Sequence, residues 1–465
     1  MTVYEEEWPK EQHKQRREAA SPRVCLVMPR FHPLFGGHIV QMTRFLPRLQ
    51  QQGIIAFVAT GMVEGDPKTK SVRDLWGEIR EERRNGRMAL FSRTLRAFTQ
   101  SWRQTFQFIR QNPSCFRRPS ANVDCVDIYR LPVWGPAKTI RSRTFAFSAA
   151  WFLLANCRRY DIIHLVGTSW HVSFSILLAK LLGKRTVVEM VLLGSDDPET
   201  IARRRFGRIN LAIWKRADCI VSLSPALTES CQRMDVAEEK VEVIPVGVAM
   251  SRFSPLPDDA AKEQMRQKLG LPSRGKLVVF VGGIMRRKGV DLLIDAWSLV
   301  RQALPDAHLV CVGPIAFSAD SRVFFEAQKQ KIASLGLREA VTFTGRVDDV
   351  AAYYQASDVF TLPSVTEGLP NSVLEAMACE LPPVMSDIPG ISRSIIRSAA
   401  EGTVFEGRTP AALAAALLSY LQDDGRREVV GQNARQRIAE AYSLTYRTER
   451  YTALYRGLLP GLDVV

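Results

Sequence analysis

Short apolar segments alternate with longer amphipathic segments along most of this chain of 465 residues, and this alternation limits the possible fold more than any other feature. Segments such as 23–28, 162–166 and 276–283 are rich in valine, isoleucine and leucine and have the length of buried strands. Buried strands that are separated by helices form a parallel sheet with helical crossovers. The sequence therefore predicts an α/β protein.

The alternation runs twice, which predicts two Rossmann-like, doubly wound parallel-sheet domains. We expect an arm at 1–21, a first domain at 22–252, a connection at 253–275, a second domain at 276–441 and a C-terminal segment at 442–465. Further strands are expected at 54–59, 126–131, 186–191, 219–223, 308–313, 341–344, 359–362 and 383–386. Helices are expected at 39–51, 411–422, 426–441 and 443–459, and the last should pack back on the first domain.

Residues 62–122 interrupt this pattern and carry much of the positive charge. The formal net charge is +15, which calls for a polyanionic neighbour such as a membrane surface, a nucleic acid or a phosphorylated substrate. Between Arg83 and Val123 there are nine arginines and no acidic residue. The charge of this insertion therefore predicts a contact with a polyanion.

A stripe of large apolar residues runs through the same insertion at helical spacing. Its members are Phe91, Leu95, Phe98, Trp102, Phe106 and Ile109, and arginines lie on a neighbouring arc. Such a helix can lie on an anionic membrane through 83–118, or it can pack its stripe on the protein's own core. Nucleic-acid binding is the third alternative, although nothing here resembles a known reader of nucleic acid.

Targeting and redox features indicate a cytoplasmic protein, with a peripheral position at the inner face of a membrane as a further expectation. The first residues are acidic and lack the apolar region of a secretory signal. The longest apolar run, 145–157, is too short to span a bilayer. The eight cysteines are scattered singly, so we expect buried free thiols.

The stretch 366–378, with the sequence TEGLPNSVLEAMA, predicts a binding site for an anion. It follows the expected strand at 359–362, breaks at Gly368 and Pro370, and resumes as a helix. Ser372 and Glu375 have the spacing of a capping box. A glycine loop that ends on a helix N-terminus presents unpaired N–H groups, which bind phosphate.

Glu367 and Glu375 place two carboxylates beside this expected phosphate site. A nucleotide sugar would explain both, because its diphosphate takes the N–H groups while its hydroxyls donate to the carboxylates. The alternative is that Glu375 only closes a capping box and that Glu367 is a solvated loop residue. The spacing alone leaves both interpretations open.

The order of these motifs resembles the retaining glycosyltransferases of family 4, which have the GT-B fold. The likeness covers roughly residues 23–450 and rests on Gly36-Gly37, on the run 281–296 (VGGIMRRKGVDLLIDA) and on the Glu-x7-Glu pair from Glu367 to Glu375. The resemblance implies two domains that face a cleft, with a nucleotide diphosphate sugar bound mostly by the second. It also implies transfer to a glycan or a lipid-linked acceptor.

The resemblance also assigns residues. Glu367 and Lys288 would be catalytic, with Lys288 neutralising the leaving diphosphate. The donor would be bound by Arg287, Lys288, Val347, Gly368, Leu369, Pro370 and Glu375, although Pro370 has no N–H to give. Gly36, Gly37 and His38 would lie on the acceptor side. No cofactor is implied.

Two departures from the family pattern affect these assignments. Gly283 stands where a second cation is usual, so Arg286 or Arg287 must supply it, or it is absent. The histidine usual after the strand at 186–191 is missing, and Asp196 and Asp197 follow there instead. These two are either acceptor-side groups or the cap of the next helix.

The sequence contains no Asp-x-Asp pair, so a metal-dependent design is unsupported and no metal ligand is assigned. His164 and His171 are interpreted as packed histidines rather than catalysts. The main hypothesis is thus a retaining, metal-independent glycosyltransferase. Its alternative is a non-catalytic scaffold of the same fold that binds membranes or polyanions.

Overall fold

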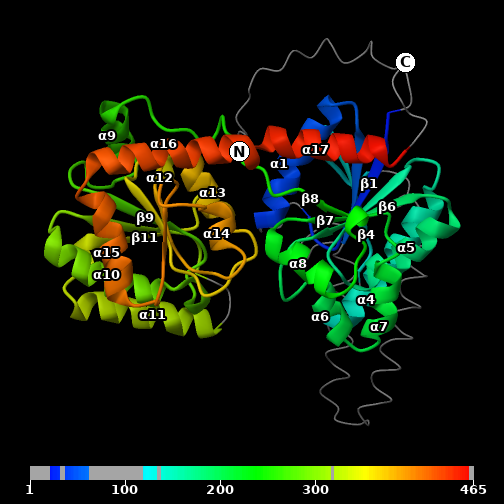
Figure 1. Cartoon of the computed structure of the whole chain (residues 1–465), viewed down its shortest axis with the longest axis horizontal. Coiled ribbons are helices and arrows are strands. Elements are labelled where there is room, and N and C mark those ends of the chain that lie inside the picture. Colours follow the sequence, from blue (N-terminus) through cyan, green and yellow to red (C-terminus); the bar gives the residue numbers. More distant parts are fainter. Residues whose placement is uncertain (1–20, 32–36, 62–118, 134–137, 316–318, 460–465) are drawn as a thin grey trace, which may run out of the picture.

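The computed structural model describes residues 21–31, 37–61, 119–133, 138–315 and 319–459. These residues form two parallel-sheet units that lie side by side (Figure 1). We name them the N-terminal unit, which carries an eight-stranded sheet, and the C-terminal unit, which carries a six-stranded sheet. The prediction of two doubly wound sheets is confirmed.

The sheet of the N-terminal unit has the strand order β3-β4-β2-β1-β5-β6-β7-β8. The strands are β1 (Arg23–Met28), β2 (Ile55–Gly61), β3 (Ala121–Val123), β4 (Val126–Leu131), β5 (Ile162–Val166), β6 (Arg185–Met190), β7 (Cys219–Ser222) and β8 (Val241–Val243). All pairs are parallel except β3 with β4, which form a hairpin. Its two turn residues, Asp124 and Cys125, both have positive φ, as a tight hairpin turn requires.

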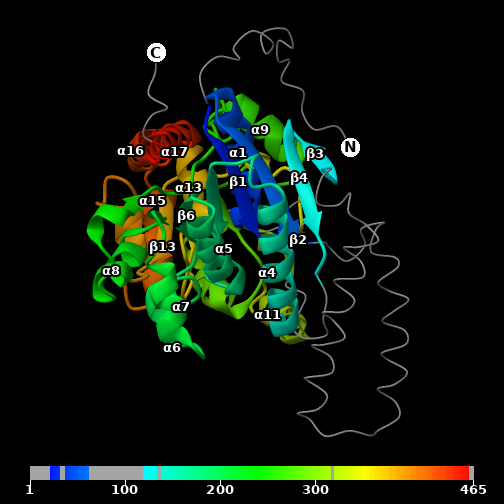
Figure 2. The same ribbon diagram turned by 90° about the vertical axis from the view of Figure 1, so that its right-hand side faces the viewer.

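The helices of this unit are α1 (Gly37–Gln51), α4 (Lys138–Ala155), α5 (Trp170–Leu181), α6 (Pro198–Arg203), α7 (Gly207–Trp214) and α8 (Pro225–Arg233). Figure 2 shows α4 and α5 side by side in front of the strands. The predicted strands at 126–131 and 162–166 have the same ends in the structure as β4 and β5. Their residues are almost all buried, which explains why apolar content alone located them.

The sheet of the C-terminal unit is wholly parallel, with the order β11-β10-β9-β12-β13-β14. The strands are β9 (Leu277–Val281), β10 (His308–Val312), β11 (Val341–Gly345), β12 (Val359–Leu362), β13 (Pro383–Ser386) and β14 (Thr403–Phe405). Its helices are α10 (Val290–Ala303), α11 (Ala319–Ser334), α12 (Ala351–Gln355), α13 (Asn371–Ala378), α14 (Ser392–Ile395), α15 (Pro410–Leu421) and α16 (Asp424–Ala441). Three-residue 3-10 helices lie at Glu238–Lys240, Arg286–Lys288 and Arg338–Ala340.

Each strand order reverses direction at one point, between β1 and β5 in the first sheet and between β9 and β12 in the second. Ligands of doubly wound sheets bind outside the carboxyl ends of the strands at such a switch point. The loop after β9 contains Lys288, and the loop after β12 contains Glu367. The strand order therefore brings the two residues that the sequence singled out to one switch point.

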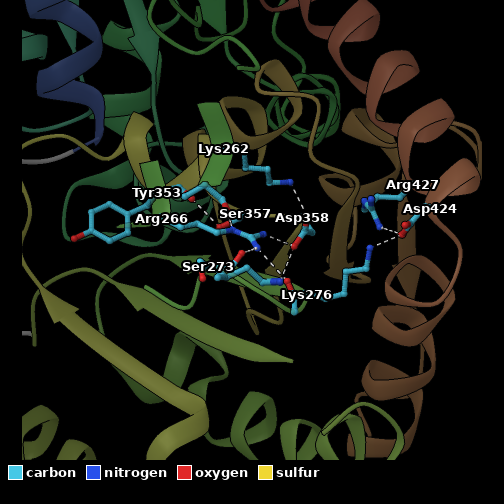
Figure 3. A network of polar contacts seen from close by, with 12 residues as sticks. Lys262, Arg266, Ser273, Lys276, Tyr353, Ser357, Asp358, Asp424 and Arg427 are labelled. Carbon is cyan, nitrogen blue, oxygen red and sulfur yellow. Dashed lines mark hydrogen bonds and ion pairs between the residues drawn. The ribbon is translucent and has the colours of Figure 1, made fainter. Parts of the chain in front are cut away.

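The connection expected at 253–275 contains a helix that the sequence analysis missed, α9 (Asp259–Lys268). It docks on the C-terminal unit through the buried carboxylate of Asp358, which accepts hydrogen bonds from Lys262 at 2.6 Å and Arg266 at 2.7 Å (Figure 3). Asp358 also accepts from the backbone N–H of Leu277 at 2.6 Å. Burial raises the pKa of Asp358, but the two cations outweigh it and hold the pKa below its ordinary value.

The C-terminal segment returns to the N-terminal unit, as predicted. Helix α16 ends at Ala441, and α17 (Leu444–Gly457) then packs along α1 (Figure 1). At the crossing point Val248 donates to Tyr442 O at 2.7 Å, and Leu444 donates to Val248 O at 2.8 Å. The two chain segments that connect the N-terminal and C-terminal units are therefore hydrogen-bonded to each other.

All of the arm expected at 1–21 except Ser21, and the basic segment 83–118, lie outside the described residues. The insertion was expected to end at 122, but regular structure resumes one residue after Ser120, where β3 begins at Ala121.

Within the described ranges, no helix has both the length and the hydropathy to cross a bilayer. Five described cysteines are buried and Cys157 is half-buried, but Cys125 is exposed on the hairpin turn, so the expectation of buried thiols is wrong there.

Candidate functional site

Lys288 and Glu367 form the centre of the site. Lys288 Nζ lies 2.6 Å from Glu367 Oε1, and the Arg287 guanidinium lies 3.3 Å from Glu367 Oε2. The side chains of Lys288 and Glu367 are only 14% and 8% exposed, whereas that of Arg287 is 44% exposed. Two cations thus converge on one carboxylate, with Arg287 nearer to solvent.

The backbone brings these residues together. Val365 N donates to Arg287 O at 2.8 Å, which joins the loop after β12 to the loop after β9. Gly289 follows Lys288 with φ +71°, and a Cβ atom there would lie 2.0 Å from Pro363 O. Only glycine permits this approach, because another residue would both clash and be strained. The Arg287-Lys288-Gly289 run is therefore shaped to fit the end of β12.

The helix after the Glu367 loop begins differently from the prediction. Helix α13 starts at Asn371 with Pro370 as its N-cap, and no side chain caps it. The expected capping box of Ser372 with Glu375 is therefore wrong, since both residues lie inside the helix. Its N-terminus still follows the glycine loop of Gly368 and Leu369, as the anion-site prediction requires.

Glu375 instead bridges the two units. Its Oε1 lies 3.6 Å from the Arg44 guanidinium on α1, and its Oε2 accepts a hydrogen bond from Tyr354 at 3.2 Å. Burial raises the pKa of Glu375, and Arg44 opposes that rise. The interpretation of Glu375 as a mere cap is excluded, and a carboxylate of the C-terminal unit is paired with a cation of the N-terminal unit.

Gly368 marks a second close approach between the units. A Cβ atom on Gly368 would lie 3.0 Å from Leu192 Cδ1 and 3.1 Å from Val191 O, both in the loop after β6. The side chains of Leu192 and Leu193 are 43% and 37% exposed beside this contact. The expected donor loop therefore packs directly against the expected acceptor side.

On that side, Gly36 lies outside the described residues, Gly37 is the first residue of α1, and His38 follows it. The His38 ring is largely buried, with Nδ1 at 3.7 Å from Glu189 Oε1. Neither ring nitrogen has a hydrogen-bond partner among the residues described here. Burial lowers the pKa of His38 to about 4, so the ring is neutral at pH 7.

Glu189 lies beside His38 on the expected acceptor side, and the sequence analysis assigned no role to it. Its carboxylate is fully buried at the end of β6, where the family pattern has a different sequence. It pairs with the Arg447 guanidinium at 3.0 Å, accepts from Tyr451 at 2.6 Å and lies 3.2 Å from His164 Nε2. Although burial raises the pKa of Glu189, Arg447 outweighs it and holds the pKa well below its ordinary value.

The remaining predicted residues are placed as follows. Asp197 caps α6 by accepting from Thr200 N at 2.8 Å, which confirms the cap interpretation. His171 contacts Val166 O at 3.3 Å within the core, as expected of a packed histidine. Val347 follows β11 and packs, partly buried, on the hydrophobic core. The assignment of Val347 to donor binding stays a prediction.

Two family models match the chain and together cover most of it. The model for glycosyl transferases group 1 matches residues 261–437, and the model for the glycosyl transferase 4-like domain matches residues 71–247. The chain belongs to the family 4 glycosyltransferases.

Curated relatives within this family include a D-inositol 3-phosphate glycosyltransferase from Salinispora arenicola, which is 35% identical over 44% of this chain and 47% of its own length. A mannosylfructose-phosphate synthase from Agrobacterium fabrum is 31% identical over 40% of this chain and 41% of its own length. The chain thus matches less than half the length of these two family 4 members.

Solved structures share the fold. HepE from Anabaena, in complex with UDP-glucose, superposes with a TM-score of 0.67 at 15% identity, over 94% of this chain and 100% of its own. Sucrose-phosphate synthase from Thermosynechococcus elongatus superposes with a TM-score of 0.67 at 20% identity, over 94% of this chain and 99% of its own. At these identities the likeness establishes the GT-B fold of this family 4 glycosyltransferase.

Proposed function

We propose that this protein is a retaining, metal-independent glycosyltransferase that moves a sugar from a nucleotide diphosphate sugar to an acceptor hydroxyl. The observation that carries the proposal is the convergence of Lys288 and Arg287 on Glu367 at the start of the loop before α13. A diphosphate needs fixed cations and N–H groups, and the sugar needs carboxylates as hydrogen-bond acceptors. This one place offers all three.

The donor's charge would be held by Lys288, Arg287 and the backbone N–H groups around Gly368 and Leu369. Lys288 is held 2.6 Å from Glu367, so its ammonium is already positioned before a donor arrives. A cation placed where negative charge develops on the leaving diphosphate lowers the barrier to transfer. No step of this scheme requires a metal ion, and full activity in excess EDTA is the expected result.

The carboxylates would hold the donor's hydroxyls, Glu367 at the transferred sugar and Glu375 at the ribose. Glu375 has contacts at both oxygens, but a carboxylate has about four lone-pair sites, so sites remain for ribose. Val347 and Pro370 would contribute shape rather than charge. This division follows the family resemblance, and the positions of both carboxylates support it.

On the acceptor side we propose that Gly36, Gly37 and His38 border the incoming hydroxyl. The acceptor would approach from the same face as the departing diphosphate, which then takes the hydroxyl proton and leads to retention. Exposed Leu192 and Leu193 beside Gly368 favour an acceptor with an apolar part, such as a lipid-linked one, over a purely polar growing glycan. We place the enzyme at the cytoplasmic face of a membrane, with the basic segment 83–118 as one expected contact.

The decisive experiment is a transfer assay over a panel of UDP- and GDP-sugars after a thermal-shift screen finds the donor. Lys288→Ala and Glu375→Ala are expected to reduce kcat/KM at least a hundredfold, in line with the loss of a positioned charge. Arg286→Ala is the matched control, because Arg286 adjoins Arg287 but is 79% exposed and should leave activity unchanged. Wild-type rates in both site variants would refute the proposed site.

The alternative, a non-catalytic scaffold, predicts a different result from the same screen. Such a protein would show no stabilisation by any nucleotide sugar. The preserved approach of Lys288 to Glu367 argues against it, because a scaffold has no need of two cations on one carboxylate. Anomeric configuration of the product, measured by NMR, tests retention separately.

A further inference from the structure

A basic and apolar surface lies where α6 meets α7, at the end of the N-terminal unit away from α17 (Figures 1 and 2). We call it the α6–α7 surface, and its exposed members are Arg203, Arg204, Arg205, Phe206, Arg208 and Ile209. Phe206 is 55% exposed and Ile209 is 61% exposed. Large apolar side chains and arginines thus alternate on one exposed turn.

The backbone of Phe206 is unusual. Its φ is +61° and its ψ is +24°, in the left-handed region that favours glycine and asparagine and is an outlier for a bulky residue. The turn is forced, because a Cβ atom on the next residue, Gly207, would lie 2.2 Å from Ala202 O. Phe206 therefore bears strain without gaining burial. An exposed aromatic ring held at a strained position indicates a use outside the fold.

The arginines of the surface have few partners within the protein. Arg205 lies over the Phe206 ring, with Cζ 5.3 Å from the ring centroid. Arg203 has only a long ion pair of 3.8 Å with Glu199, and its side chain is 81% exposed. No carboxylate within the described residues pairs with Arg205 or Arg208. The positive charge of the surface is therefore available to an outside anion.

The turn is firmly held. Arg204 is exposed like its neighbours, but its guanidinium donates to Ser195 O at 2.5 Å and to Thr168 O at 3.2 Å. Ser173 of α5 donates to Asn210 of α7 at 3.3 Å, which joins the two helices. Phe174, the next residue on α5, is 49% exposed. A preorganised surface of this kind binds without first having to order itself.

We propose that the α6–α7 surface docks on an anionic lipid bilayer, with Phe206 and Ile209 in the headgroup region and Arg205 and Arg208 on the lipid phosphates. Apolar and aromatic side chains flanked by arginines have the chemistry of an interfacial membrane contact. This proposal goes beyond the transfer reaction, because it needs neither donor nor acceptor. The residues that carry it lie outside segment 83–118 of the sequence.

Docking here would bring the bilayer to the acceptor side of the site. The surface follows directly on the loop after β6, whose Leu192 contacts Gly368. Arg204 ties the turn to that loop through Ser195 O. A membrane held at Phe206 would therefore be linked through one rigid segment to the place where the acceptor is expected.

The test is flotation of the full-length chain with vesicles of phosphatidylcholine alone or with phosphatidylglycerol. Phe206→Gly relieves the backbone strain, so its melting temperature should be at least that of the wild type while its partition coefficient falls about tenfold. Ile209→Ser should act in the same direction. Arg205→Gln with Arg208→Gln should weaken binding about fivefold for each charge removed, and only with the anionic vesicles.

Two matched controls test whether binding depends on this surface or on any exposed apolar side chain or cation. Val323→Ser removes an apolar side chain that is 71% exposed on α11, and Arg274→Gln removes an exposed cation of the C-terminal unit. Both should float like the wild type. Unchanged flotation of Phe206→Gly would overturn the proposal, and so would retention on a nucleic-acid polyanion without vesicle binding. None of these readouts depends on transfer activity.

Discussion

The Arg44 guanidinium of α1 lies 3.6 Å from Glu375 Oε1 of α13, so an ion pair joins the two sheet units beside the proposed donor site. Arg44 is further held over the Phe253 ring, with Cζ 5.5 Å from its centroid. Around Glu375 the other titratable groups are Arg252, the Tyr354 hydroxyl and the Cys379 thiol. Arg44 is the largest of the influences that keep this buried carboxylate ionised.

Removing Arg44 should make donor binding depend on pH. Burial already raises the pKa of Glu375, and without Arg44 the pKa rises further, so the carboxylate becomes protonated as pH falls. A protonated Glu375 is a poorer acceptor for ribose hydroxyls. We expect Arg44→Gln to raise the donor KM, and to raise it more at pH 6 than at pH 8.

Two variants make this test specific. Arg44→Lys keeps the charge and should keep the pH profile of the wild type. Arg48→Gln removes a cation one turn further along α1 and should leave the profile nearly unchanged. A loss of affinity that is equal at every pH in Arg44→Gln would show that Arg44 acts only by packing.

Replacing one member of the Glu189–Arg447 pair should strongly destabilise the fold. Both side chains are almost fully buried, so Glu189→Gln leaves the Arg447 charge without a counterion. Breaking a buried pair costs about 3–5 kcal/mol. Urea unfolding at pH 7 should show this loss, and Glu189→Gln combined with Arg447→Met should recover part of it. A loss in the double variant equal to the sum of the losses in Glu189→Gln and in Arg447→Met alone would mean that the pair carries no coupling energy.

Stability should also fall in mild acid because of two buried histidines. Burial lowers the pKa of His38 and of His171 to about 4 in the folded protein, whereas an unfolded histidine has a pKa near 6.5. The unfolded chain therefore binds more protons between these values, and the free energy of unfolding decreases as pH falls through that range. Each histidine should contribute up to about 3 kcal/mol of this loss.

Chemical denaturation at a series of pH values from 7 to 4.5 measures the effect. His171→Leu removes one of the two titrating groups from the core. The slope of unfolding free energy against pH should therefore become shallower, by an amount that corresponds to at most one proton taken up on unfolding. A slope identical to that of the wild type would show that His171 takes up protons equally in the folded and the unfolded protein, and would contradict a lowered pKa in the folded state.

The sequence was sufficient for those elements whose residues are buried on both faces of a sheet. The strands at 23–28, 359–362 and 383–386 were predicted with their observed ends, because continuous apolar runs of that length leave few alternatives. It was insufficient for β3, β8 and β14, each of three residues, since so short a strand has no readable period. Helix α9 was missed because its sequence is mostly polar and its docking depends on distant Asp358.

The same distinction applies to the site. Lys288 and Glu367 were both assigned to the expected donor site, and their side chains lie 2.6 Å apart because strands β9 and β12 are neighbours in the sheet. The Glu189–Arg447 pair spans 258 residues, and no local pattern announces it. Ser372 fitted the N-cap of a capping box by spacing alone, but the N-cap is Pro370, two residues earlier, and the helix begins at Asn371. The spacing of Ser372 and Glu375 did not reveal that Pro370 would be the N-cap of this helix.

Gly289 provides the sharpest steric test of the proposed site, because Gly336 offers a matched control. Both glycines have positive φ, +71° and +69°. A Cβ atom on Gly289 would lie 2.0 Å from Pro363 O, whereas a Cβ atom on Gly336 would meet nothing within 4 Å. Gly336→Ala should therefore cost only the backbone strain, about 1 kcal/mol, and leave transfer unchanged.

Gly289→Ala should cost several kcal/mol more, because the loop after β9 must move away from β12 and Lys288 moves with it. Donor-dependent thermal stabilisation should disappear even where the protein remains folded at 20 °C by circular dichroism. If Gly289→Ala and Gly336→Ala had the same melting temperature and the same response to donor, the close approach of the two loops would not be what positions Lys288 against Glu367.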